Sequence, residues 1–328
     1  MLSVGREIGR RSILIPTTDD TAIFLASYAD ALRDSFIFPR LNARIVRSLC
    51  SKREMYYLAK KYNVPTAEAV FPQCKEDVLN FSKDATFPII LKAIRGSRLQ
   101  RRVGRTMAIA QTRNELLSNY EAMEDPEEPN LMLQEYIPGD DDTIWMFNGY
   151  FNESSDCVIG LTGRKLRQWP VHQGVTSLGL CVGNPTVEKA TKDFMKAIGY
   201  TGILDAGYRY DARDGRYKVL DINPRIGATF RLFVADDGMD VARALYLDIT
   251  KQPMSTQAAT DGRKWFVEDY DVQSFVRDRK LSFARWIASY RGVREAAYFA
   301  ADDPGPFLQM LVRNIYRMSL FPIGKLSS

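Results

Sequence analysis

Short apolar runs alternate with segments of helical periodicity along most of the chain. Apolar residues three and four positions apart, often behind a polar or acidic residue, predict helices. We expect these helices at Asp20–Phe36, Asn42–Tyr62, Lys75–Lys83, Thr112–Met123, Asn184–Ile198, Asp237–Thr250, Val272–Arg279, Ser282–Arg291 and Phe307–Met318. Apolar runs bounded by turn residues predict strands at Ser12–Pro16, Ala67–Phe71, Phe87–Lys92, Leu131–Ile137, Thr143–Phe151, Cys157–Leu161 and Lys264–Val267. The alternation of the two patterns indicates an α/β (α+β) fold.

The most informative stretch is a predicted hairpin. Two strand-like runs, Ile203–Tyr210 and Tyr217–Ile222, flank an Asp-Gly turn, which is a strong hairpin signal. The second run leads into Asp221, Asn223 and Arg225, and alternation along a strand places the first two on one face. Adjacent oxygen donors followed by an arginine suit a hard cation that also meets phosphate. The other interpretation is a strand that simply ends in an Asn-Pro turn.

A basic segment follows another predicted strand. Lys92 ends the apolar run Phe87–Lys92, and small and basic residues fill the next segment, Arg95–Arg105. We expect a mobile loop here, with a further strand beginning near Thr106. Backbone amides and cations in such a loop can surround the phosphates of a nucleotide. A solvated basic loop, or a patch that binds nucleic acid, is the alternative interpretation. The small residues Gly174–Ser177 predict another loop.

The N-terminal segment has one predicted strand and one predicted helix before the helix at Asn42–Tyr62. One strand and one helix cannot form a parallel sheet by themselves. We therefore interpret residues 1–65 as the end of a larger α/β domain, whose earlier units are absent here or are supplied by another chain.

Composition and charge narrow the class of protein. Of the 328 residues, 45% are hydrophobic and 26% charged, which is ordinary for two or three globular subdomains. The net charge of +5 does not imply nucleic-acid binding, and four scattered cysteines without a CxxC pair predict neither a disulfide framework nor a zinc site. No apolar run approaches membrane-spanning length and the first residues lack the apolar core of a signal peptide, so we expect a cytoplasmic protein. The amphipathic, basic helix at Phe307–Met318 is expected to pack or to dock a partner, with membrane contact as the other interpretation.

Four separated motifs, taken together, resemble the ATP-grasp superfamily. In order, they are Lys52 in an early helix, Lys92 at a strand end, Gln134–Gly139 and Leu220–Arg225. Over about residues 12–250 the chain resembles above all the carboxylate–amine ligases and the carbamoyl-phosphate-synthase-like proteins of that superfamily. The resemblance implies an ATP-grasp fold with a truncated N-terminal pre-ATP-grasp α/β unit. It divides the chain into that remnant with a linking helix at 1–65, a lid subdomain at 66–136, a large subdomain with the metal site at 137–255 and a helical C-terminal extension at 256–328.

The resemblance also implies where ATP is held. Lys92 is expected to bind the α- and β-phosphates, with Lys52 as a second phosphate contact. Adenine is expected against the linker formed by Gln134, Glu135, Tyr136 and Ile137. The carbonyl of Glu135 would accept a hydrogen bond from the amino group and the amide of Ile137 would donate one to the ring. Asp141, or its neighbour Asp142, is placed at the ribose hydroxyls.

A magnesium site, or a manganese site, is implied at the end of the hairpin. By the resemblance, Asp221 and Asn223 are metal ligands, and Arg225 steadies the transferred phosphoryl group or the acyl phosphate. The family usually supplies another acidic ligand from the preceding strand, where this chain has Gly207. Asp205, two residues earlier on the same strand face, is expected to take that role, with a weaker second metal site or a water ligand as alternatives.

The implied activity is that of an ATP-dependent ligase. A carboxylate would be activated as an acyl phosphate with release of ADP, and then joined to an amine in a C–N bond, without a side-chain nucleophile. Arg164, Lys165 and Arg167 suggest an anionic substrate such as an amino acid or a phosphorylated compound. The alternative is that these residues form a solvated basic face. His172 is either a residue of the substrate loop or a structural residue. The expected partners are small carboxylate and amine substrates, not nucleic acid, together with a second copy or another chain that completes the N-terminal unit. A weakened homologue that binds a nucleotide or a partner without turnover, or a nucleic-acid binder using Arg95–Arg105, are the alternatives.

Overall fold

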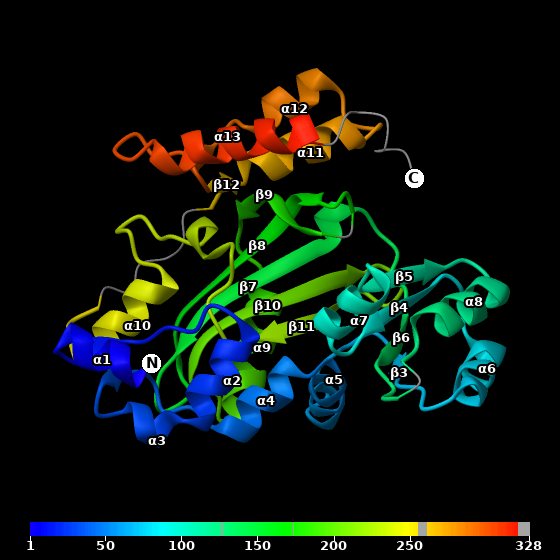
Figure 1. The fold of residues 1–328 in the computed structure, drawn as a ribbon, viewed down its shortest axis with the longest axis horizontal. Coiled ribbons are helices and arrows are strands. Elements are labelled where there is room, and N and C mark those ends of the chain that lie inside the picture. Colours follow the sequence, from blue (N-terminus) through cyan, green and yellow to red (C-terminus); the bar gives the residue numbers. More distant parts are fainter. Residues whose placement is uncertain (126, 173, 255–260, 321–328) are drawn as a thin grey trace.

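Two sheets of different size form the body of the protein (Figure 1). The computed structural model describes residues 1–125, 127–172, 174–254 and 261–320, with the backbone alone at residues 96, 97 and 317–320. The larger sheet runs in the order β11-β10-β7-β8-β9-β12-β13, and only its last pair is parallel. Its strands are β7 (Ile144–Phe151), β8 (Cys157–Trp169), β9 (Val175–Cys181), β10 (Gly202–Asp211), β11 (Arg216–Asn223), β12 (Lys264–Phe266) and β13 (Val293–Ala296). The predicted hairpin is confirmed as β10 and β11.

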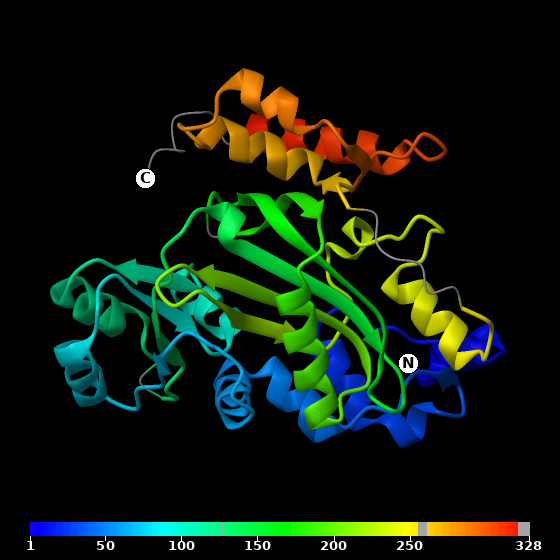
Figure 2. The same cartoon turned by 180° about the vertical axis from the view of Figure 1, so that it is seen from behind.

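Helices cover both faces of the larger sheet. Alternation along β7 sends Phe147 to the face packed by α9 (Pro185–Ile198) and Met146 to the face packed by α10 (Val241–Ile249). Figure 2 shows α9 lying across the sheet when it is seen from behind. The strand β8 is longer than the expected Cys157–Leu161, and the chain that follows its turn is strand β9 from Val175 on, not the predicted small-residue loop. A small residue is needed in β9 where a bulky side chain packs against the strand. At Gly179, a side chain would collide with Leu232.

The smaller sheet has four antiparallel strands in the order β3-β6-β4-β5. They are β3 (Ala69–Val70), β4 (Ile89–Ala93), β5 (Met107–Ala110) and β6 (Leu131–Glu135), covered by α6 (Lys75–Asp84) and α8 (Arg113–Met123). Leu91, Leu116 and Leu133 are fully buried between the sheet and its helices. The strand and helix predictions for this region are confirmed.

The mobile loop expected at Arg95–Arg105 is wrong, because this segment contains helix α7 (Gly96–Val103). Leu99, 1% exposed, anchors the helix in the core of the smaller sheet. Arg98 forms ion pairs with Asp125 (2.7 Å) and Glu128, which neutralise part of the charge of the segment. Gly104 then ends the helix in a left-handed conformation (φ 74°), which glycine adopts without strain.

The N-terminal unit also differs from the prediction. The helix expected at Asp20–Phe36 is divided into two short helices, α2 (Asp19–Ser27) and α3 (Ala29–Leu32). An additional helix, α1 (Leu2–Ile8), precedes them in the sequence. Buried Phe36 then starts strand β2 (Phe36–Ile37), which pairs in parallel with β1 (Ser12–Ile13). The segment therefore does form a small parallel sheet by itself.

The second predicted helix is divided at Ser51. The backbone of Ser51 is extended (φ −96°, ψ 114°), and its hydroxyl accepts a hydrogen bond from the amide of Glu54 at 3.3 Å. This cap ends α4 (Ala43–Cys50) and begins α5 (Lys52–Lys61), so Lys52 is the first residue of a helix.

Three C-terminal helices form a separate layer along the outer strands of the larger sheet (Figure 1). They are α11 (Glu268–Arg277), α12 (Phe283–Ser289) and α13 (Gly305–Leu320). The layer is held by one buried ion pair, in which Arg167 of β8 contacts both carboxylate oxygens of Asp271, at 2.7 and 2.8 Å. Trp286 and Tyr290 also donate to Asp271. None of the helices in the described part of the chain has the length and apolar character needed to cross a membrane.

We expect Asp271→Asn to detach or loosen this layer. Asp271 is 0% exposed, and the substitution leaves the Arg167 guanidinium buried without its charge partner, at a cost of about 3 kcal/mol in the free energy of unfolding. Urea unfolding would measure the loss. Asp302→Asn, at an exposed position of the same layer, is the matched control and should change stability by less than about 0.5 kcal/mol. Equal stability of the two variants would show that the ion pair does not hold the layer.

Candidate functional site

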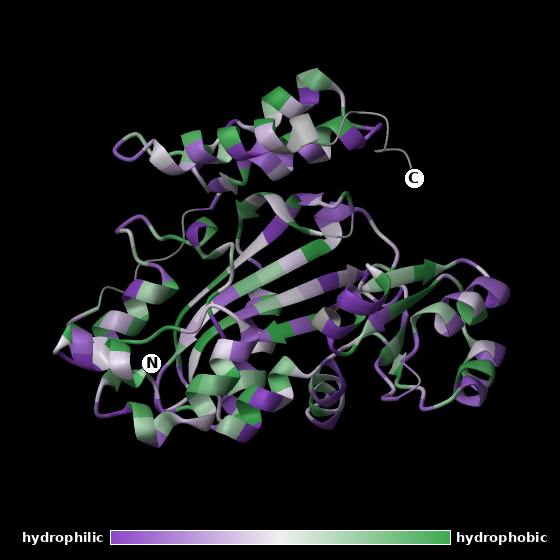
Figure 3. Cartoon of the chain, viewed as in Figure 1, coloured by the Kyte–Doolittle hydropathy of each residue, from purple (hydrophilic) through white to green (hydrophobic). Residues whose placement is uncertain are grey.

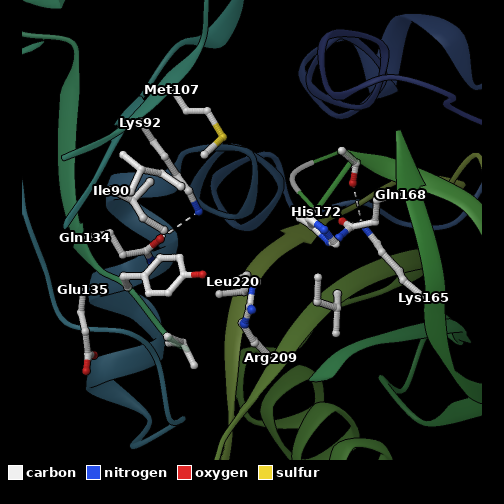
Figure 4. A pocket seen from close by; sticks show the side chains of 15 residues that line it. Ile90, Lys92, Met107, Gln134, Glu135, Lys165, Gln168, His172, Arg209 and Leu220 are labelled. Carbon is white, nitrogen blue, oxygen red and sulfur yellow. Dashed lines mark hydrogen bonds between the residues drawn. The ribbon is translucent and has the colours of Figure 1, made fainter. Parts of the chain in front are cut away.

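A cavity of about 240 Å³ lies between the smaller sheet and the larger one (Figure 4). Lys92 and Gln134 reach it from β4 and β6, while Lys165 and Arg209 reach it from β8 and β10. The two pairs face each other because the smaller sheet stands over the end of the larger one. Lys92 and the expected adenine residues therefore border the same space, whereas Lys52 lines a separate cavity beside Ile94 and Arg95.

Three half-buried lysines surround this site without an ionic partner. The ammonium group of Lys52 donates to the carbonyl of Ala93 at 3.0 Å, and that of Lys92 donates to the side chain of Gln134 at 2.8 Å. Lys165 donates to a main-chain carbonyl at 3.1 Å. Within the described ranges, no carboxylate lies at ion-pair distance from any of the three. A half-buried cation bonded only to neutral oxygens is unfavourable, so the site is suited to an anion with several charges.

The same burial shifts the acid–base behaviour of the lysines. Burial, together with the neighbouring charges of Lys52 and Arg209, lowers the pKa of Lys92 to about 8. Burial also lowers the pKa of Lys52 and of Lys165. The largest opposing influence in all three is the negative charge of Asp221, which favours each ammonium form. Asp221 is thus the common counter-charge of the cluster.

Oxygen donors gather beside Asp221 at the end of the hairpin. Asp205 and Asn223 are direct partners across β10 and β11. The amide of Asn223 donates to Asp221 at 2.9 Å and to the carbonyl oxygen of Asp205 at 3.2 Å. Burial, and then the charge of Asp221, raises the pKa of Asp205. The strand alternation expected from the sequence therefore holds, and Asp205, Asp221 and Asn223 lie together.

Gly207 leaves room for the Asp221 carboxylate. The two residues are paired across the hairpin, and a side-chain carbon at position 207 would overlap with Oδ1 of Asp221. Among the described residues, neither this site nor any other has three or more His, Cys, Asp or Glu side chains arranged to hold a metal ion. Mg²⁺ commonly uses one or two protein carboxylates and completes its shell with water and phosphate oxygens. Asp221 and Asn223 fit such an ion, which would need the remaining ligands from a bound phosphate.

Arg225 connects the N-terminal unit to this group. Its guanidinium lies 3.1 Å from the carboxylate of Asp205 and 3.3 Å from that of Asp19, the first residue of α2. Beside the pair is a second cavity of about 470 Å³, lined by residues of the N-terminal unit and of the chain after the hairpin, among them Thr18 and Phe230. The sequence analysis missed Asp19, because nothing in its local pattern indicates a contact with a residue so distant in the chain.

The expected adenine linker borders the cavity, but its side chains have different surroundings. Tyr136 and Ile137 line the space, and the guanidinium of Arg209 lies over the Tyr136 ring at 5.8 Å. The Glu135 side chain points away from the cavity centre in Figure 4. Its carboxylate is paired with Arg213 at 2.5 Å and Lys218 at 3.6 Å, so only the backbone of Glu135 is available to a ligand on this side.

An acid and the single histidine meet at the rim of the cavity. Asp141 accepts a hydrogen bond from Gln168 at 3.1 Å, and Nδ1 of His172 lies 2.9 Å from the same carboxylate oxygen. His172 and Gln168 line the cavity, whereas neither Asp141 nor its alternative, Asp142, is among the lining residues. The structure thus places Asp141 and His172 together, a pairing that the sequence analysis did not anticipate.

The predicted basic cluster of β8 is not one surface. Only Lys165 lines the cavity. Arg164 lies on the other face of the sheet, with its guanidinium 5.5 Å from the Trp145 ring, and Arg167 is buried on Asp271. Adjacent residues of a strand point to opposite faces, and a bulge after Lys165 displaces the rest. Arg209, which the sequence analysis did not single out, lines the cavity instead of Arg164 and Arg167. It follows Asp205 and Gly207 on one strand face, and this alternation could have identified it.

Comparisons with known proteins agree with the resemblance seen in the sequence. The chain is 26% identical over 247 residues to D-aspartate ligase of Enterococcus faecium (strain Aus0004), which covers 71% of this chain and 58% of the relative. It is 24% identical over 265 residues to the C-terminal section of the carbamoyl phosphate synthase large chain of Methanocaldococcus jannaschii, which covers 77% of this chain and 38% of the relative. The chain thus spans about half the length of these relatives. No family model matches it.

A solved structure has the same fold. It is the biotin carboxylase domain of Hydrogenobacter thermophilus 2-oxoglutarate carboxylase, determined with MgADP, ADP and bicarbonate. The TM-score is 0.59 at 17% identity, over 78% of this chain and 57% of that one. The resemblance stated from four motifs is confirmed, and with it the fold class.

The depressed pKa of Lys92 predicts how stability depends on pH. The unfolded chain holds the Lys92 proton up to a pH near 10.5, whereas the folded chain releases it near 8. Between these values the unfolded state binds more protons, so wild-type stability should rise with pH relative to Lys92→Met, by about 1 kcal/mol per pH unit. Urea unfolding of both proteins at several values between about pH 7.5 and 10, which cover most of this window, would measure this difference. A constant difference would mean that Lys92 titrates normally.

Proposed function

We propose that this chain, which has the ATP-grasp fold, is an ATP-dependent ligase that activates a carboxylate as an acyl phosphate, releases ADP and joins the acyl group to an amine. The observation that carries the proposal is the cluster of three half-buried lysines around Asp221. A triphosphate supplies the charges that this cluster lacks. The relatives support a ligase, since the sequence match with D-aspartate ligase covers 71% of this chain.

In this proposal the nucleotide lies along the cavity, with its base near the linker and its phosphates near the lysines. Lys92 would exchange its bond to Gln134 for the α- and β-phosphates, and Lys52 would provide a second phosphate contact. The backbone of Glu135 and Ile137 would recognise adenine, and Tyr136 would pack beside it. Asp141, steadied by Gln168 and His172, would accept hydrogen bonds from the ribose.

Asp221 and Asn223 are the proposed ligands of Mg²⁺, with Mn²⁺ as a substitute. When bound, the ion would neutralise phosphate charge beside the three lysines. Asp205 was expected to be a further ligand, but its carboxylate is already bonded to Asn148 at 2.9 Å and to Arg225 at 3.1 Å. We therefore propose that Asp205 orients Arg225.

The reaction would then depend on placement and charge neutralisation. The substrate carboxylate oxygen attacks the γ-phosphorus, and the bond to the β–γ bridging oxygen breaks to release ADP. The amine nitrogen next attacks the acyl carbon, and inorganic phosphate leaves. Arg225 would bind the carboxylate and the transferred phosphoryl group, after displacing its contact with Asp19. Lys92 and Lys165 would stabilise the charge on the phosphates.

The cavity beside Arg225 is the proposed place of the carboxylate substrate, and we propose an amino acid. The sequence relative is named for D-aspartate, whereas the biotin carboxylase structure holds bicarbonate. Release of ADP and phosphate with D-aspartate, other amino acids or bicarbonate, each paired with a set of amines, tests the activity. ATP binding without ADP release for any pair would favour a nucleotide-binding protein without turnover.

Mg-ATP should raise the melting temperature by about 5 °C at a concentration near 100 times Kd, because it binds only the folded chain. Lys92→Ala should remove most of this shift. Lys83→Ala, at an exposed lysine of α6, is the control and should retain it. Differential scanning fluorimetry measures all three proteins. An unchanged wild-type melting curve would overturn the assignment of the nucleotide site.

Asp221→Asn should lower ADP release by roughly 100-fold or more, because it removes the only charged ligand among the proposed metal ligands while leaving the adenine linker intact. Asp205→Asn should instead raise KM for the carboxylate substrate, since Arg225 loses its anchor. Asp142→Asn, outside the cavity, should behave as wild type. Steady-state kinetics beside nucleotide-binding measurements separate the roles, and normal turnover of Asp221→Asn would refute the metal assignment.

A further inference from the structure

Helix α13 packs on the protein through a side that carries both apolar and polar residues. Met310 is 4% exposed, and the Phe307 ring packs edge-on against Phe299 at 5.6 Å. Beside them, Arg313 donates to the buried carboxylate of Asp269 at 3.0 Å, and its guanidinium lies 5.8 Å from the Tyr298 ring. These contacts determine which side of α13 faces the protein.

The apolar side of α13 faces outward. Leu308 is 56% exposed, Val312 66% and Ile315 63%, and Leu311 is 40% exposed. Spacings of three and four positions place these side chains on one helix face. The hydropathy colours of Figure 3 show apolar and polar positions interleaved along this ribbon. A helix that packs on a globular body normally buries its apolar side chains, whereas α13 leaves this second apolar stripe exposed.

The neighbouring helices add to the exposed apolar surface. Val276 of α11 is 72% exposed, and Phe283 and Ile287 of α12 are 63% and 49% exposed. All three lie in the same C-terminal layer, which stands at the outer side of the molecule in both views (Figures 1 and 2). Exposed apolar side chains gathered in one region mark an interaction site more often than isolated ones do.

The exposed charges of this layer are mainly positive. Among residues 268–316, the exposed acidic residues are Asp302 and Asp303. The exposed basic residues are Arg277, Arg279, Lys280, Arg285, Arg291, Arg294 and Arg313. Two copies meeting through this layer would bring these like charges together. A surface of anionic phosphates would meet them with opposite charge.

We propose that the α11–α13 layer binds the surface of an anionic lipid bilayer. The outer face of α13 would insert its apolar side chains among the acyl chains just below the headgroups. The exposed arginines other than Arg313, which is paired with Asp269, and Lys280 would contact lipid phosphates. Apolar burial combined with charge attraction holds interfacial helices on membranes. None of the described helices has an apolar stretch long enough to span the bilayer, so in this proposal the protein lies on the bilayer surface. This inference is independent of the ligase activity.

The test is sedimentation with phosphatidylcholine vesicles containing about one-third phosphatidylglycerol, beside vesicles of phosphatidylcholine alone. The full chain should sediment with the anionic vesicles and much less with the neutral ones. The double variant Leu308→Glu/Ile315→Glu places two charges on the outer face and should bind roughly tenfold or more weakly. Arg279→Ala/Lys280→Ala should weaken binding to anionic vesicles and reduce its dependence on salt.

Val4→Glu is the matched control, since it replaces an exposed apolar residue of α1, far from the layer in Figure 1. It should bind as wild type, and circular dichroism should show that all variants are folded. Wild-type protein that stays in the supernatant would overturn the proposal, as would equal binding by Leu308→Glu/Ile315→Glu. Sedimentation velocity supplies the remaining outcome: a wild-type dimer without vesicle binding, made monomeric by the same double variant, would assign the face to a second copy instead.

Discussion

Half-burying three ammonium groups near one shared carboxylate costs free energy. The arrangement of the two sheets brings these three groups together at one site. Lys52, Lys92 and Lys165 come from a helix start, a strand of the smaller sheet and a strand of the larger sheet. Each has only a neutral oxygen as its hydrogen-bond partner, and Asp221 is the charge they share. The nucleotide-free protein therefore stores an unfavourable charge distribution that a polyanion relieves. The depressed pKa of Lys92 is the measurable sign of that strain, because releasing a proton is the other way to relieve it.

Local patterns were sufficient to predict the parts of the site that depend on one strand. The positions of Asp221 and Asn223 follow from alternation in a hairpin whose turn is marked by Asp-Gly, and the structure keeps this register. Lys92 and Gln134 required only that two apolar strands pair, as β4 and β6 do. The fold class was likewise accessible, since short strands and periodic helices alternate along the chain.

Contacts between distant segments could not be predicted in the same way. The charge run at Arg95–Arg105 looked like a loop because its acidic partners, such as Asp125, come later in the sequence. Arg167 resembled a substrate ligand for the same reason, although Asp271 buries it. For α13, periodicity gives an apolar face but does not say which way that face turns. In the structure, long-range contacts hold that direction: Arg313 pairs with Asp269, and Phe307 packs on Phe299.

The ion pairs of Glu135 determine how the smaller sheet can move. Arg213 and Lys218 hold this residue at the hairpin, and next to it the amide of Val219 donates to the carbonyl of Pro65 at 2.8 Å. These contacts fasten the sheet to the hairpin at the corner formed by β3 and β6, and β5 lies at the far edge. A rotation about that corner would displace β4 and β5 by a larger arc than the linker. A nucleotide bound as proposed would then keep its base seated while its phosphates enter and leave.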